Sequence, residues 1–183
     1  AFGSLPHLRR AFLLAAIGLV AVALGRPQRL STDPAEVGGI DIVIALDVSN
    51  SMRETDLVPD RITAAKRVLA RFIDERRGDF MGLVVFASRP FTQAPLTDDR
   101  GVLLDLLGRV DIGMLPDGTA IGTALAMAEN HLKNMPRHSG VIVLITDGGN
   151  ITGAPDPLTA ARIANAICVR IYVIGMSSRT GAR

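Results

Sequence analysis

Short apolar runs alternate with segments of helical periodicity along most of this chain. A strand-like run lies at 169–174, and three other runs, at 42–46, 80–86 and 141–145, are nearly uninterrupted and rich in β-branched residues. Such runs are typical of strands that are buried on both faces of a parallel sheet. Helical spacing predicts helices near 60–77, 97–107, 119–132 and 158–167. The alternation predicts an α/β fold with a doubly wound, mostly parallel sheet and helices on both of its faces.

Capping and proline residues predict where the elements begin and end. Asp60 can cap a helix that continues to about Arg77, and Gly78 ends it. Pro90 and Pro95 bracket residues 91–94, which predicts a short edge strand antiparallel to the strand before it. The stripe of the first helix that faces the core is expected to comprise Ile62, Ala65, Val68, Leu69, Phe72 and Ile73.

The first 39 residues differ from the rest of the chain. Residues 11–25 carry no charge and no strongly polar side chain, and arginines stand on both sides of them. We therefore predict a transmembrane helix at 11–25, a basic juxtamembrane segment at 1–10, a linker at 26–39 and a folded domain at 40–183. A signal peptide with a small-residue cleavage site at 21–23 is the alternative, whereas a buried helix should show a polar face. The flanking charges do not decide the orientation in the membrane.

Composition excludes some classes of protein. The net charge is only +2 and basic residues are interleaved with acidic ones, so no stripe for nucleic acid stands out. Aromatic residues make up 4% of the chain and tryptophan is absent, which argues against platforms for base stacking. The single cysteine, Cys168, lies in an apolar run and is expected to be a small buried hydrophobe.

Polar side chains follow two of the predicted strands directly. Asp47, Ser49 and Ser51 follow the first strand at alternate positions, and Asp147 follows the strand at 141–145. If these strands are neighbours, the side chains converge with Thr119 in one crevice, because ligands of open α/β sheets bind at the carboxyl ends of strands. Two carboxylates and three hydroxyls suit a hard cation such as Mg²⁺. A turn or helix cap is the ordinary alternative for the first triplet.

In these segments the sequence resembles the von Willebrand factor A (VWA) domain. Residues 47–51 (DVSNS) fit its D-x-S-x-S signature, and 117–122 (DGTAIG) and 145–150 (ITDGGN) follow in the family's order. The resemblance implies a metal-ion-dependent adhesion site (MIDAS) made by Asp47, Ser49, Ser51, Thr119 and Asp147, with Asp117 behind them. It also implies the strand order 3-2-1-4-5 with strand 3 antiparallel. The family adds a further helix and strand, so we expect the domain as given to be truncated at its C-terminal end.

A narrower resemblance is to the bacterial aerotolerance-type (Bat) membrane proteins. It rests on the apolar segment that ends at 25–28 (GRPQ), on 51–66 (SMRETDLVPDRITAAK) and on 82–99 (GLVVFASRPFTQAPLTDD). The resemblance implies anchoring in the bacterial cytoplasmic membrane, with the VWA domain on the extracytoplasmic side. It implies as partners a MoxR-type AAA+ ATPase and other VWA proteins.

We expect a metal-dependent protein-interaction module rather than an enzyme. The metal would be Mg²⁺, or alternatively Mn²⁺ or Ca²⁺, and a protein partner would supply a carboxylate to it. None of the three histidines is adjacent to the proposed ligands in sequence, and the sequence lacks the common nucleophile and phosphate-binding motifs. A Mg²⁺-dependent hydrolase or phosphatase and a chelatase-like VWA subunit are the alternatives.

Overall fold

The computed structural model describes residues 12, 14, 16, 39–133 and 140–177. The chain divides into two compact units, Ala1–Glu36 and Val37–Arg183, and the second contains the sheet. The predicted basic segment at 1–10 lies outside the described residues, as does nearly all of the membrane helix at 11–25 and of the linker at 26–39. Within the described ranges, no helix has the length and apolar character that a membrane crossing requires.

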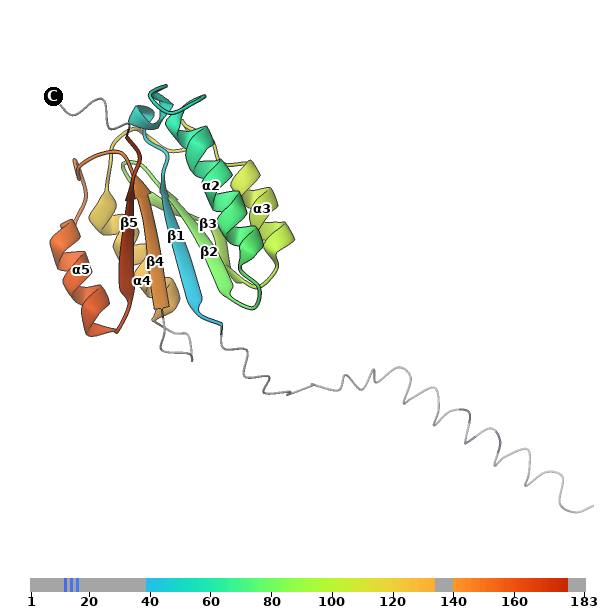
Figure 1. Ribbon diagram of the computed structural model, residues 1–183. Helices are drawn as coiled ribbons and strands as arrows, with labels where there is room; N and C mark the ends of the chain where they lie inside the picture. Colours follow the sequence, from blue (N-terminus) through green and yellow to red (C-terminus); the bar gives the residue numbers. More distant parts are fainter. Residues whose placement is uncertain (1–11, 13, 15, 17–38, 134–139, 178–183) are drawn as a thin grey trace, which may run out of the picture. The chain divides into compact units, whose positions relative to one another are not determined.

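Five strands form one sheet in the order β3-β2-β1-β4-β5 (Figure 1). Their bounds are Asp41–Asp47 for β1, Phe80–Phe86 for β2, Pro90–Thr97 for β3, Gly140–Thr146 for β4 and Arg170–Gly175 for β5. All neighbours are parallel except β2 and β3. The predicted α/β class, strand order and antiparallel edge strand are therefore confirmed. The prolines lie within that edge strand, which is longer than predicted.

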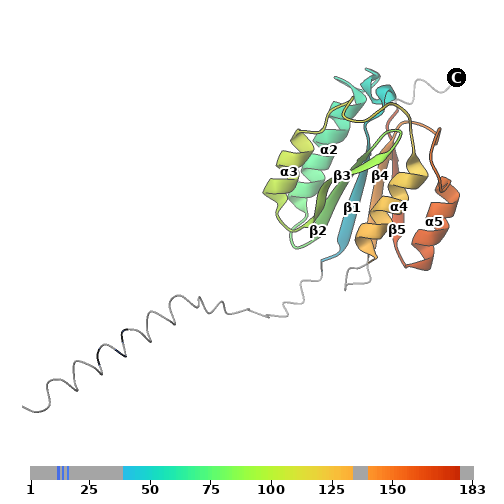
Figure 2. The ribbon, with the colours of Figure 1, turned by 180° about the vertical axis from the view of Figure 1, so that it is seen from behind.

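Helices cover both faces of the sheet, as Figures 1 and 2 show. On one face lie α2 and α3, and on the other lie α4 and α5. Their bounds are Arg61–Glu75 for α2, Arg100–Gly108 for α3, Ile121–Leu132 for α4 and Pro157–Ala166 for α5, and a short 3-10 helix, η1, spans Asn50–Arg53. Aspartates cap three helices: Asp60 accepts a hydrogen bond from Thr63 N at 2.7 Å, and Asp99 and Asp156 cap α3 and α5 in the same way. The predicted start of α2 is confirmed, and Gly78 takes a φ of 88° just beyond its end.

The central strand, β1, is buried along its whole length. Because side chains alternate along a strand, Ile42, Ile44 and Leu46 join the core beneath α2 and α3, while Val43 and Ala45 join the core beneath α4. The strand therefore delivers Asp47 to the carboxyl edge of the sheet, between β2 and β4.

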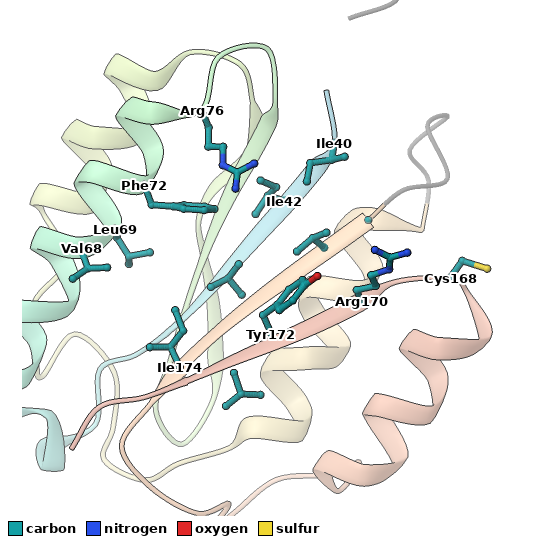
Figure 3. A pocket seen from close by; sticks show the side chains of 14 residues that line it. Ile40, Ile42, Val68, Leu69, Phe72, Arg76, Cys168, Arg170, Tyr172 and Ile174 are labelled. Carbon is teal, nitrogen blue, oxygen red and sulfur yellow. The ribbon is translucent and has the colours of Figure 1, made fainter. Parts of the chain in front are cut away.

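Two predictions of burial are wrong, and both concern the same side of the domain. Val68 is 57% exposed, and Cys168 is exposed with a φ of 59°. The strand that follows Cys168, β5, is also exposed along most of its length. The reason is a hollow between α2 and β5, which has a volume of about 790 Å³. Mainly apolar side chains line it, as Figure 3 shows. In the part of the chain that the structure describes, β5 pairs only with β4, and most of its side chains stay exposed, whereas Val143 and Ile145 of β4 are buried in the core beneath α2.

One buried carboxylate makes the stability of the domain depend on pH. Glu129 in α4 is 5% exposed, and its Oε1 has no hydrogen-bond partner among the described residues. Burial raises the pKa of Glu129 from 4.5 to about 6. The folded state therefore favours the protonated acid, and this contribution to stability is complete below pH 4.5 and is lost as the pH rises through about 6.

We expect Glu129→Gln to remove this pH dependence, because the amide cannot ionise. At pH 7.5 the variant should be more stable than the wild type by about 2 kcal/mol, and at pH 4.5 the two should be nearly equal. Urea denaturation at both pH values measures the difference. An amide variant that is less stable at pH 7.5 would show that the carboxylate has a stabilising partner. The matched control is Glu75→Gln at the exposed end of α2, which should change little.

Candidate metal centre

Asp47 lies at the bottom of the candidate site and is fully buried. Its Oδ1 accepts a hydrogen bond from Ser49 N at 2.9 Å, and its Oδ2 accepts one from Thr146 Oγ1 at 2.7 Å. Burial raises the pKa of Asp47, and the nearby Asp147 carboxylate also raises it, against the hydrogen bonds from Ser49 and Thr146 that lower it. The site therefore holds a desolvated carboxylate beside a second one, an arrangement that a bound cation stabilises.

A chain of hydroxyl groups links the first loop to the third. Ser51 Oγ donates to Asp147 Oδ1 at 2.8 Å, and Ser49 Oγ lies 3.0 Å from Ser51 Oγ. Because Ser51 uses its only hydroxyl proton on Asp147, the bond between the serines must be donated by Ser49. Ser49 is 3% exposed, whereas Ser51 is exposed, so the network runs from the protein interior to the surface.

The second loop lies beside this network and is joined to it through Asp117. Asp117 Oδ1 accepts a hydrogen bond from Asn50 N at 3.0 Å, and this bond holds the pKa of Asp117 below its usual value. Thr119 is 3% exposed, and its carbonyl oxygen accepts hydrogen bonds from Ile151 N and Thr152 N in the third loop. Gly118 precedes it with a φ of 134°, a conformation that other residues rarely adopt.

Four of the five predicted ligands thus belong to one hydrogen-bonded network. These are Asp47, Ser49, Ser51 and Asp147. Thr119 is tied to the third loop through its backbone, and the bonds that build the network among the described residues do not include its hydroxyl. The two strands that are followed by these aspartates, β1 and β4, are direct neighbours in the sheet. The sequence predicts that the ligand side chains converge if these strands are neighbours.

Sequence reasoning missed two residues that hold these ligands in place. Thr146 binds Asp47, and Arg61 forms an ion pair with Asp147. Thr146 could have been found, because it is the last residue of β4 and directly precedes Asp147. Arg61 is far from Asp147 in the sequence, so no local pattern connects the two residues. The sequence pattern assigns a role only to its neighbour Asp60, as a helix cap.

The side chains fit a hard divalent cation by their chemistry. Asp47 and Asp147 supply negative charge, and Ser49, Ser51 and Thr119 supply neutral oxygens. In the described ranges, no three His, Cys, Asp or Glu residues cluster in a way that could hold a metal ion, so this candidate set depends on its hydroxyls. The assignment of the five residues as ligands remains a prediction.

Comparison with known proteins identifies the class of domain. Residues 42–150 match the family model described as the von Willebrand factor type A domain. The chain therefore belongs to the von Willebrand factor type A family.

Similarity to individual proteins places the chain, within this family, among the Bat-like membrane proteins. An aerotolerance-related membrane protein from Bacteroides fragilis is 34% identical with a TM-score of 0.71, and the match covers 75% of this chain and 67% of that one. BatB from Bacteroides thetaiotaomicron is also 34% identical, with a TM-score of 0.70 over 75% and 66% of the two chains. A UPF0353 protein from Mycolicibacterium paratuberculosis is 33% identical over 96% of this chain and 56% of its own length. This chain spans about half the length of the curated relatives that it matches.

Proposed function

We propose that this chain is a metal-dependent protein-docking module of a membrane-anchored VWA protein. The observation that carries the proposal is the network in which Asp47, Ser49, Ser51 and Asp147 join two loops at the carboxyl edge of the sheet. A divalent cation held by this network and Thr119 would supply positive charge to which a carboxylate of a partner protein can bind. Mg²⁺ is the proposed metal, with Mn²⁺ and Ca²⁺ as alternatives.

The residues of the site orient a ligand but do not form an acid–base pair for turnover. The buried Asp47 is engaged by Ser49 and Thr146, and Asp147 is engaged by Ser51 and Arg61. His131, the one histidine within the described residues, lies in α4 with its Nε2 at 2.9 Å from Thr92 Oγ1 of β3. We therefore propose binding rather than hydrolysis.

The proposed setting follows from the relatives. Similar proteins are described as an aerotolerance-related membrane protein and as a membrane-spanning protein from Vibrio fischeri. We propose anchoring in the bacterial cytoplasmic membrane through residues 11–25. A MoxR-type AAA+ ATPase and other VWA proteins are the proposed partners.

Metal-dependent binding can be tested with the immobilised chain and a purified MoxR-type ATPase from the same organism. We expect binding in Mg²⁺ to weaken about tenfold or more in EDTA and in Thr119→Ala, because each change removes part of the contact to the partner carboxylate. Thr159→Ala, an exposed threonine of α5, is the matched control and should bind like the wild type. A membrane extract provides a second source of partners.

Hydrolysis of p-nitrophenyl phosphate should be measured in parallel. We expect no turnover above the uncatalysed rate with or without Mg²⁺. Partner binding that is the same in Mg²⁺, in EDTA and in Thr119→Ala would contradict the docking function. Mg²⁺-dependent hydrolysis that disappears in Asp47→Asn would instead establish an enzyme.

A further inference from the structure

Arg61 places a fixed positive charge directly against the candidate metal centre. It is the first residue of α2, and its side chain is 16% exposed. Its Nη1 donates to Asp147 Oδ2 and, at 3.3 Å, to the carbonyl oxygen of Ser51. The side chain of Asp147 is only 1% exposed, so this ion pair is largely shielded from water, and dissolved salt weakens it little.

Asp56 holds the guanidinium group from the other side. Arg61 Nε lies 2.7 Å from Asp56 Oδ1, and Nη2 lies 3.1 Å from Asp56 Oδ2. This two-point contact uses the planar fork of arginine, which lysine cannot reproduce. Asp56 therefore fixes the guanidinium in place and offsets part of its charge.

A divalent cation at this site would share Asp147 with Arg61. In the metal-free chain, Arg61 is the cation that compensates Asp147. With a metal ion bound, two cations lie close to one carboxylate and repel each other. Removing Arg61 therefore destabilises the metal-free state more than the metal-bound state, and the difference between these two effects changes the metal affinity.

We propose that Arg61 is an internal cation that stabilises the metal-free site and lowers its affinity for the divalent ion. This inference rests on the metal site of the proposed function and assigns its regulation to a residue that is not a ligand. The opposite role, in which Arg61 only orients Asp147, predicts weaker metal binding when Arg61 is lost. Asp147 keeps two other constraints without Arg61, namely its position at the end of β4 and the Ser51 hydroxyl on its Oδ1.

Calorimetric titration of the purified chain with MgCl₂ and with MnCl₂ tests the proposal. Arg61→Gln should bind both ions about fivefold or more tightly than the wild type, at the lower end of ordinary coupling between two ligands. Its melting temperature without metal should be lower than that of the wild type. Arg61→Lys keeps the charge and should bind the ions within about twofold of the wild type, although it loses the fork.

Arg76→Gln is the matched control, because it removes the same charge from the opposite end of the same helix. Arg76 follows the last residue of α2, 15 residues from its start, and its side chain is 46% exposed in its ion pair with Asp79. The Arg76→Gln variant should bind the metal ions with the same affinity as the wild type. Asp56→Asn is a second variant, and it should weaken metal binding because the whole charge of Arg61 then acts on Asp147.

The outcomes separate this inference from the proposed function. A wild-type chain that binds neither Mg²⁺ nor Mn²⁺ would contradict the metal-dependent function, and the inference with it. A wild-type chain that binds metal, with Arg61→Gln binding it equally or more weakly, would contradict the role of Arg61 alone. An equal gain in affinity in Arg76→Gln, or unchanged or tighter binding in Asp56→Asn, would also overturn that role.

Discussion

Asp47→Asn is expected to abolish the stabilisation that Mg²⁺ confers on this chain. Asp47 is the fully buried carboxylate of the site, and its charge is what a bound cation would compensate there. At a hundredfold excess of Mg²⁺ over the dissociation constant, the melting temperature of the wild type should rise by about 5 to 10 °C. The variant should show no rise, because the amide has the shape of the carboxylate but not its charge. Thermal denaturation with and without Mg²⁺ measures both.

The fold should survive this substitution, which makes the loss of metal response interpretable. The amide oxygen of the substituted side chain can still accept one of the two hydrogen bonds that Ser49 and Thr146 donate to Asp47. Asp47→Ala should also lose the metal response, but with a lower melting temperature, because both donors then lack a partner. Asp105→Asn on the exposed surface of α3 is the control for charge. A Mg²⁺ response of wild-type size in Asp47→Asn would refute the site.

Gly122→Ala is expected to be the most destabilising substitution of a single small residue in α4. An added Cβ would lie 1.9 Å from the carbonyl oxygen of Pro155 and 2.9 Å from the carbonyl carbon of Asp156. Both atoms belong to the backbone of the segment that leads into α5, so no side chain can turn away to relieve the clash. We expect a loss of about 3 kcal/mol in the free energy of unfolding, at the upper end of the usual cost of overpacking.

The same clash should disturb the metal centre, because Ile121 N donates a hydrogen bond to Asn150 Oδ1 and so joins α4 to the third loop. Gly108→Ala in α3 is the matched control, since nothing lies within 4 Å of its added Cβ. That variant should gain about 0.5 kcal/mol from helix propensity and reduced freedom of the unfolded chain. Urea denaturation of the two variants should therefore give changes of opposite sign. A Gly122→Ala variant as stable as the wild type would mean that α4 and the Pro155 segment separate easily.

The candidate site could be predicted from the sequence to the extent that its residues stand next to strands. Asp47 and Asp147 directly follow apolar runs, so their place at the carboxyl edge follows from chain order and the geometry of parallel strands. The assignment of Thr119 as a ligand depended on the resemblance to the VWA domain, because its loop does not directly follow an apolar strand. Arg61 could not be predicted in this way, because its contact with Asp147 joins positions 86 residues apart. Only the packing of α2 beside the central strand brings the two side chains together.

The sequence alone determined the α/β class, the capping of α2 by Asp60 and the identity of the acids at the strand ends. These features depend on periodicity and on residues close to one another in the chain, and such local preferences are encoded directly. The tertiary structure alone decided which apolar side chains are buried. Val68 and Tyr172 have the pattern of core residues, yet they line an open hollow between α2 and β5. A periodic pattern shows which face of an element is apolar, but burial requires a second element against that face, and only the three-dimensional arrangement shows whether one is present.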